Sequence, residues 1–200
     1  MKAALLLVDI QNDFLPGGSL AVPRGNEILP VANQLMQDFD HVIATQDWHP
    51  SNHGSFAANH VGAEVGTKIE LDGLEQILWP VHCVQNSPGA DFSSELDRDK
   101  IAHVVQKGTN PLVDSYSGFF DNARRQATGL EDYLREQSID QLHLIGLATD
   151  YCVKFTALDA VDLGFKTILH ESGVRGVNLN EGDSKEAIKI MANAGVEIVD

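Results

Sequence analysis

Short apolar runs alternate with segments of helical periodicity along most of the chain, and this alternation limits the folds open to it more than any other feature. The apolar runs that predict buried strands cover residues 3–9, 41–47, 101–107, 141–147, 165–170 and 196–200. The segments that predict helices cover residues 26–39, 129–138, 150–164 and 181–195. Continuous apolar strands separated by helices are typical of a parallel sheet that is covered on both faces. We therefore expect a three-layer, Rossmann-like α/β/α fold with a mostly parallel central sheet.

The stretch from about residue 48 to 100 lacks this alternation. It is rich in Gly, Pro, Asn, Ser and His and shows little regular periodicity. A long irregular insertion within a compact domain is usually a functional loop region rather than a linker. Two hundred residues suffice for a sizeable core, and we find no internal repeat or domain boundary in the sequence. We expect a single domain over residues 1–200.

The charge and the cysteine content narrow the classes of function. The formal net charge of −15 disfavours binding to nucleic acid or to an anionic membrane, because both would repel such a surface. Only two cysteines occur, Cys83 and Cys152, which is too few for a disulfide framework and fits a reducing compartment. The apolar run Ala3–Val8 is too short for a signal peptide, and no segment approaches the length of a membrane span. We expect a cytoplasmic protein, and the sequence leaves homo-oligomerisation open.

Polar residues stand at the carboxyl ends of the predicted strands. Asp9, Asp47 and Lys107 each end a strand, and the strand over 141–147 runs into Cys152 at the start of a helix. Parallel strands bring these ends to one edge of the sheet, where α/β proteins bind ligands. A carboxylate can accept the proton of a thiol, and an ammonium group stabilises the resulting anion. The alternative is a buried ion pair beside a packed thiol, which leaves the position of the thiol unexplained.

A second cluster of polar residues lies in the irregular stretch. Asp47 and His49 are two residues apart in an extended segment, so that their side chains point to the same side. With His82 they would form a site of two histidines and one carboxylate, a ligand set that suits Zn²⁺, Fe²⁺ or Mn²⁺. His53 follows in a loop of undefined geometry. It is open whether His53 is a ligand, a partner of a ligand or a solvated residue.

Five segments together resemble the nicotinamidase/pyrazinamidase branch of the isochorismatase-like cysteine hydrolases. They are LLLVDIQNDFLPGGSLAVPRGNEI, ATQDWHPSNHGSF, WPVHCVQNSPGADF, KGTNPLVDSYSGFFDN and GLATDYCVKFTALDA. The segments occur in the order found in that family, and the resemblance extends from Leu5 to the last predicted strand. Any one of them is a weak signal, whereas five in order are specific.

The resemblance implies the roles of several residues. The catalytic triad corresponds to Asp9, Lys107 and Cys152. The oxyanion hole corresponds to the backbone N–H groups of Ala148 and Cys152, with a cis peptide between Leu147 and Ala148.

The resemblance also implies the ligands of one divalent metal ion and the walls of the substrate site. The metal ligands correspond to Asp47, His49 and His82, with zinc as the first choice of metal and iron or manganese as alternatives. The aromatic residues that enclose the substrate ring correspond to Phe14, Trp79 and Tyr116. Some members carry a histidine where this chain has Tyr151, which leaves the role of that residue open.

The activity that the resemblance implies is the metal-dependent hydrolysis of nicotinamide to nicotinate and ammonia, and of pyrazinamide to pyrazinoate. The reaction would pass through a thioester on Cys152 and serve NAD salvage. Two alternatives remain: a related amidase that acts on another amide or an N-carbamoyl compound, and a metal-binding or thiol-based sensor on the same fold. A sensor would have no need of Lys107 together with Asp9.

Overall fold

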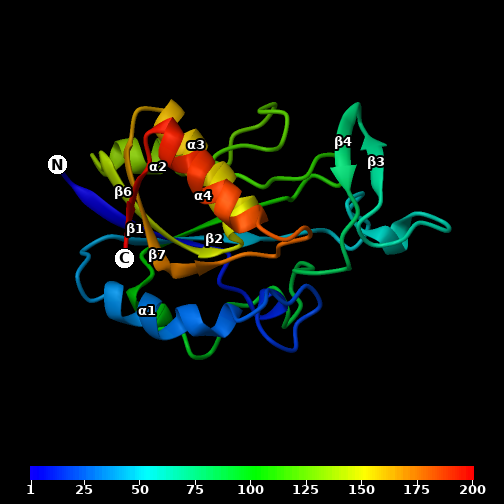
Figure 1. The fold of residues 1–200 in the computed structure, drawn as a ribbon, viewed down its shortest axis with the longest axis horizontal. Helices are drawn as coiled ribbons and strands as arrows, with labels where there is room; N and C mark the ends of the chain where they lie inside the picture. Colours follow the sequence, from blue (N-terminus) through cyan, green and yellow to red (C-terminus); the bar gives the residue numbers. More distant parts are fainter.

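The computed structural model describes residues 1–200, and its centre is a sheet of six parallel strands (Figure 1). The strands are β1 (Ala3–Val8), β2 (Val42–Asp47), β5 (His103–Lys107), β6 (Gln141–Leu147), β7 (Lys166–Arg175) and β8 (Glu197–Val199). Their order across the sheet is β5-β2-β1-β6-β7-β8, and each neighbouring pair is parallel. The expected parallel α/β architecture is therefore confirmed.

Helices cover both faces of the sheet. They are α1 (Ile28–Leu35), α2 (Leu130–Glu136), α3 (Lys154–Asp162) and α4 (Asp183–Ala194). Figure 1 shows α1 below the sheet and the other three helices above it. None of these helices combines the length and the apolarity that crossing a bilayer requires.

The central strand β1 contributes side chains to two separate cores. Leu5 and Leu7 pack with α1 on one face, whereas Leu6 and Val8 pack with α2, α3 and α4 on the other. Successive side chains of a strand point to opposite faces, so an uninterrupted apolar run serves both layers. The same burial fixes the register of β1, which determines where Asp9 emerges at its end.

The stretch between β2 and β5 is more ordered than the sequence predicts. It contains an antiparallel hairpin of β3 (Lys68–Leu71) and β4 (Leu74–Ile77), on the side of the molecule opposite the chain termini (Figure 1). Each strand has only four residues, and several of them are charged and exposed. β3 alternates polar and apolar residues over only four positions and β4 does not alternate, so neither strand gives a pattern long enough to predict it.

Two other elements differ from the predictions. The predicted helix over 150–164 begins as a π-helical turn, Thr149–Val153, which continues into α3. Strand β7 continues to Arg175, five residues past the predicted end. It does so through an irregularity in its pairing with β6, where the register shifts between Leu144 and Gly146. The polar residues within this strand hide it from a search for apolar runs.

Candidate active site

Asp9, Lys107 and Cys152 meet at the carboxyl edge of the sheet. The Lys107 Nζ atom lies 2.9 Å from Asp9 Oδ2 and 3.4 Å from Cys152 Sγ. Asp9 follows β1, Lys107 ends β5, and Cys152 lies in the turn after β6, so three parallel strands deliver them to one place. All three side chains are buried. The sequence predicted this convergence from the strand ends alone.

The Asp9 carboxylate is held by a residue that the sequence analysis did not single out. The Thr45 hydroxyl donates a hydrogen bond of 2.6 Å to Asp9 Oδ1, and the Asp9 backbone N–H donates one of 3.2 Å back to the same hydroxyl. Asp9 adopts a left-handed backbone conformation with φ of 49°, which turns the chain out of the strand. With Oδ1 bound to Thr45, the other carboxylate oxygen faces Lys107.

The buried charges set the protonation of the thiol. Burial raises the pKa of the Cys152 thiol well above its usual value, the Lys107 ammonium opposes this, and the Asp9 and Asp47 carboxylates add to it. Burial lowers the pKa of Lys107, but the two carboxylates outweigh it and hold that pKa well above normal. Burial also raises the pKa of Asp9. The thiol therefore rests protonated beside a carboxylate that can take its proton.

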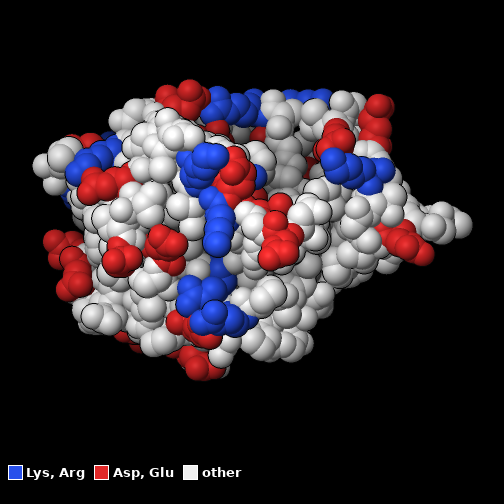
Figure 2. Space-filling view, viewed as in Figure 1, with Lys and Arg blue, Asp and Glu red and all other residues white.

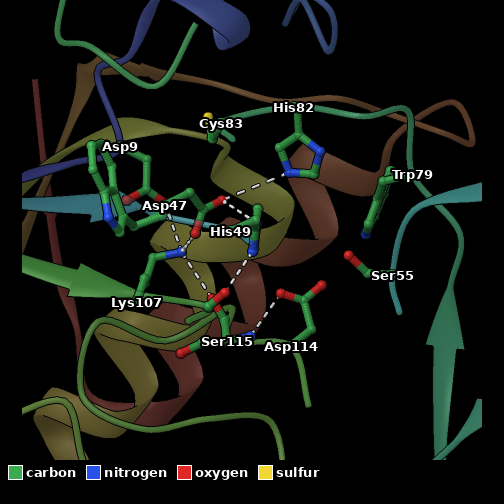
Figure 3. Close-up of polar contacts among 12 residues, drawn as sticks. Asp9, Asp47, His49, Ser55, Trp79, His82, Cys83, Lys107, Asp114 and Ser115 are labelled. Carbon is green, nitrogen blue, oxygen red and sulfur yellow. Dashed lines mark hydrogen bonds and ion pairs between the residues drawn. The ribbon is translucent and has the colours of Figure 1, made fainter. Parts of the chain in front are cut away.

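Asp47 connects this triad to a cluster of histidines (Figure 3). Its Oδ1 accepts a hydrogen bond of 2.5 Å from Lys107 Nζ, and its Oδ2 lies 3.6 Å from His49 Nε2 and 3.9 Å from His82 Nε2. The Lys107 ammonium holds the pKa of Asp47 below its usual value despite burial, which alone would raise it. One carboxylate thus serves both groups of residues.

The residues of this cluster fit a divalent metal. Ligand atoms of Asp47, His49 and His82 all lie within 4.8 Å of one another. The Nδ1 atoms of the two histidines lie 2.8 Å from the carbonyl oxygens of Gly108 and Pro80, which directs both Nε2 atoms toward Asp47. His49 Nε2 is buried and has no hydrogen-bond partner. A backbone carbonyl behind each histidine is the usual arrangement at metal-binding histidines.

His82 also has a protonation state suited to a metal. Burial and the neighbouring His49 lower the pKa of His82 to about 4. A neutral ring keeps a free lone pair for a cation at neutral pH. Burial lowers the pKa of His49 as well, but the Asp47 carboxylate outweighs burial and leaves that pKa raised.

His53, which the sequence left open, lies beside this cluster. Its ring centre is 4.4 Å from that of His49, its Nδ1 lies 2.7 Å from Ser55 Oγ, and its Nε2 is buried without a partner. It forms a second candidate ligand group with His49 and Asp114. Asp114, which is buried in the loop after β5, was not predicted from the sequence. Its only signal in the sequence is its place in the irregular stretch that follows the Lys107 strand.

Aromatic residues enclose the space in front of Cys152. This active pocket is lined by Phe14, Leu20, Asp47, Trp79, His82, Asp114, Tyr116, Ala148, Tyr151, Cys152 and Val177. All three aromatic residues expected from the sequence are among them. Tyr116 is tied to Trp79, whose indole N–H donates a hydrogen bond of 3.1 Å to the Tyr116 hydroxyl. Its lining is mostly apolar and also includes the Cys152 thiol, Asp47 and His82.

Ala148 and Cys152, the two residues that the resemblance assigns to the oxyanion hole, both line this pocket. The peptide between Leu147 and Ala148 is cis, as expected. The Ala148 carbonyl accepts hydrogen bonds from the N–H groups of Tyr151 and Val153, each of 3.1 Å, and so closes the turn. Cys152 is the fourth residue of this helical turn, among the positions whose N–H groups lack a partner within the helix.

Comparison with known proteins places this arrangement in context. A family model for the isochorismatase domain matches residues 3–200. The chain is 56% identical over 199 residues to a nicotinamidase of Escherichia coli K12, covering 98% of this chain and 93% of the relative. A nicotinamidase/pyrazinamidase of Mycobacterium tuberculosis is 35% identical over 201 residues, covering 98% of this chain and 97% of the relative.

Two solved structures resemble the whole chain. The nicotinamidase/pyrazinamidase of Acinetobacter baumanii has a TM-score of 0.96 and 45% identity, covering 100% of this chain and 96% of that one. The pyrazinamidase of Pyrococcus horikoshii, solved in complex with zinc, has a TM-score of 0.82 and 37% identity, covering 100% and 99%.

Proposed function

The chain belongs to the isochorismatase domain family, and on that premise we propose that it is a cysteine amidohydrolase that converts nicotinamide to nicotinate and ammonia. The observation that carries the proposal is the contact of Lys107 Nζ with both Asp9 and Cys152 at the base of an aromatic-lined pocket. The nicotinamidases that it resembles over almost their full length support the choice of substrate. Pyrazinamide, a six-membered ring with the same carboxamide, is the second substrate that we expect.

The first step in this proposal is formation of the nucleophile. Asp9 takes the proton of the Cys152 thiol, and the thiolate attacks the carboxamide carbon. Lys107 holds the carboxylate and the sulfur together and stabilises the negative charge that moves between them. Thr45 keeps the Asp9 carboxylate facing this pair.

The second step is stabilisation of the tetrahedral intermediate. The N–H groups of Ala148 and Cys152 are the donors that we assign to its oxyanion. Donors of this kind contribute roughly 3–4 kcal/mol each to the transition state.

The leaving group and the thioester both depend on Asp9. Protonated Asp9 returns its proton to the departing nitrogen, because an amide ion is a poor leaving group. The carbon–nitrogen bond breaks, ammonia leaves, and a thioester remains on Cys152. Asp9 then removes a proton from water, whose oxygen attacks the thioester carbon. The carbon–sulfur bond breaks, Asp9 returns the proton to the Cys152 sulfur, and the nicotinic acid formed loses its own proton to solvent and leaves as nicotinate.

We assign Asp47, His49 and His82 as the ligands of a divalent metal, with zinc as the preferred ion. The zinc bound to the Pyrococcus horikoshii pyrazinamidase supports that preference. When bound, the ion would supply a coordination position for the ring nitrogen of the substrate and so orient the ring. Phe14, Trp79 and Tyr116 are the aromatic residues that we assign to the two sides of the ring.

The same proposal includes the metabolic role of the reaction, the compartment in which it takes place and the extent of the domain. Nicotinate released in this way is the starting compound of NAD salvage, and a free thiol nucleophile suits the reducing conditions of the cytoplasm. We also propose that residues 1–200 act as one domain, which the single six-stranded sheet and the family match over 3–200 support.

The alternative amidase is less well supported by the site. An N-carbamoyl substrate has no ring nitrogen for a metal to hold, so the Asp47, His49 and His82 cluster would have no purpose in its hydrolysis. A sensor would require neither Lys107 nor Asp9 beside the thiol.

The test is a comparison of substrates with the purified protein. We expect nicotinate and ammonia from nicotinamide, pyrazinoate from pyrazinamide, and no product from N-carbamoylsarcosine. Removal of the metal with a chelator should abolish turnover, and added zinc should restore it. Hydrolysis of the N-carbamoyl compound in preference to nicotinamide would contradict the proposal.

A further inference from the structure

We propose that Tyr151 determines the size of the amides that the enzyme accepts, because its ring separates the active pocket from a second cavity at the surface. This inference rests on the proposed amidohydrolase function. The sequence left the role of Tyr151 open. In this proposal the second cavity is the space that part of a larger substrate would enter.

The second cavity, which we call the outer cavity, lies between α3, α4 and the β3–β4 hairpin. It is lined by Glu75, Ile77, Tyr116, Asp150, Tyr151, Lys154, Phe155, Asp183, Glu186, Ala187 and Ile190. Its volume of about 410 Å³ falls within the range of small-molecule pockets. Figure 2 shows the surface recessed between α4 and the hairpin.

The active pocket and the outer cavity share two side chains, Tyr116 and Tyr151. Tyr116 is the fixed part of this shared wall. Its hydroxyl accepts hydrogen bonds from Trp79 Nε1 at 3.1 Å and from Gln76 Nε2 at 3.3 Å. Burial is the main cause that raises the pKa of Tyr116 well above its usual value, and the nearby Asp114 adds to it. The hydroxyl therefore stays neutral.

Tyr151 is the other part of the wall, and it is held through its ring. The ring lies edge-on to Trp79, with centres 5.0 Å apart and planes at 90°, and its centre is 5.5 Å from that of Tyr116. On the outer side, Lys154 Nζ lies 6.0 Å from its centre. Packing of this kind gives the wall its shape, and a shorter side chain at 151 would leave the wall open.

The lining of the outer cavity indicates the class of substituent that it would take. Phe155, Ala187 and Ile190 provide apolar surface, which suits an added aromatic or alkyl group. The carboxylates of its lining outnumber its one ammonium group, Lys154, so an anionic substituent would be repelled. We therefore infer that opening the wall admits larger aromatic carboxamides with neutral substituents.

The experiment compares Tyr151→Ala and Tyr151→Phe with the unchanged protein. The probes are nicotinamide and a set of nicotinamides with one phenyl group, placed in turn on each free ring carbon. The quantity measured is kcat/KM for each phenyl compound divided by kcat/KM for nicotinamide. We expect this ratio to rise at least about tenfold for one or more compounds in Tyr151→Ala, and to stay unchanged in Tyr151→Phe, which keeps the ring.

Two further variants serve as a substitute for Tyr151→Ala and as a control. Tyr151→Leu also shortens the wall while keeping an apolar side chain, and it replaces Tyr151→Ala if that protein does not fold. Tyr133→Ala removes a tyrosine of α2 that stacks on His103 of β5. Tyr133 lies outside both cavities, so this variant should leave the ratio unchanged.

The outcomes separate this inference from the proposed function. If the unchanged protein does not hydrolyse nicotinamide, the proposed function is wrong and the inference falls with it. If the Ala or Leu variant hydrolyses nicotinamide but gains no activity on any phenyl compound, only the role of Tyr151 is overturned. An equal gain in Tyr151→Phe would also overturn it, since the ring is then not the barrier.

Discussion

The Lys107 ammonium lies 2.5 Å from Asp47 Oδ1, while the other oxygen of the same carboxylate lies 3.6 Å from His49 Nε2. The candidate metal ligands and the candidate catalytic triad therefore form one network of charges rather than two neighbouring sites. Lys107 is shared between Asp9, Asp47 and Cys152, so a change at any of these side chains alters the field felt by the others.

Replacement of the nucleophile should separate turnover from metal binding. In Cys152→Ala we expect turnover to fall by more than about 10³-fold, because no thioester can form, while bound metal per chain stays the same. Cys83→Ala is the matched control, since Cys83 is also buried but lies outside the active pocket. Substantial nicotinate production by Cys152→Ala would show that another group is the nucleophile.

Replacement of a candidate metal ligand should lower metal binding and activity together. We expect His49→Ala to reduce bound zinc, measured by elemental analysis after dialysis, and to raise KM for nicotinamide by about tenfold or more. His103→Ala, which changes a histidine at the start of β5, should leave both values unchanged. Unchanged zinc content and KM in His49→Ala would exclude the metal site as assigned.

The Thr45 hydroxyl should matter to the rate and not to binding. We expect Thr45→Val, which keeps the shape but removes the donor to Asp9 Oδ1, to lower kcat by about 10- to 100-fold with little change in KM. Thr45→Ser restores the hydroxyl and should recover most of the loss. Equal loss in both variants would mean that packing, and not the hydrogen bond, is what Thr45 contributes.

A histidine pair outside the site should make stability depend on pH. His143 Nδ1 lies 2.9 Å from His170 Nε2. Burial lowers the pKa of both histidines below the usual 6.5, and the neighbouring His170 lowers that of His143 further. Lys166 lowers the pKa of His143 further, whereas Glu197 raises it. As the pH falls from about 6.5 through the lowered values, the unfolded chain binds protons that the folded chain does not, so the free energy of unfolding decreases.

Urea unfolding at about pH 7.5 and about pH 5 measures this effect. We expect the double variant His143→Gln, His170→Gln to lose less stability between the two values than the unchanged protein. His103→Gln serves as the control for removal of a histidine elsewhere. An identical loss in the double variant would show that other groups cause the pH dependence.

Much of the site could be predicted because it lies at strand ends. Asp9, Asp47 and Lys107 end apolar runs, and parallel topology alone brings such residues together. The pairing of Asp47 with His49 was similarly visible, since both lie in one extended segment.

Features that depend on contacts across the chain could not be predicted. Asp114 approaches His49 and His53 from a loop without periodicity, and Thr45 faces Asp9 from a neighbouring strand. The position of Tyr151 between two cavities depends on how α4 and the hairpin pack around it, which no local pattern records.

The most direct test of the account is release of ammonia from nicotinamide by the zinc-loaded protein and by Cys152→Ala, with nicotinate measured in the same samples. We predict equal amounts of ammonia and nicotinate from the unchanged protein and neither product from the variant. No ammonia from a protein that demonstrably holds zinc, or equal release by both proteins, would contradict thiol-dependent hydrolysis of nicotinamide.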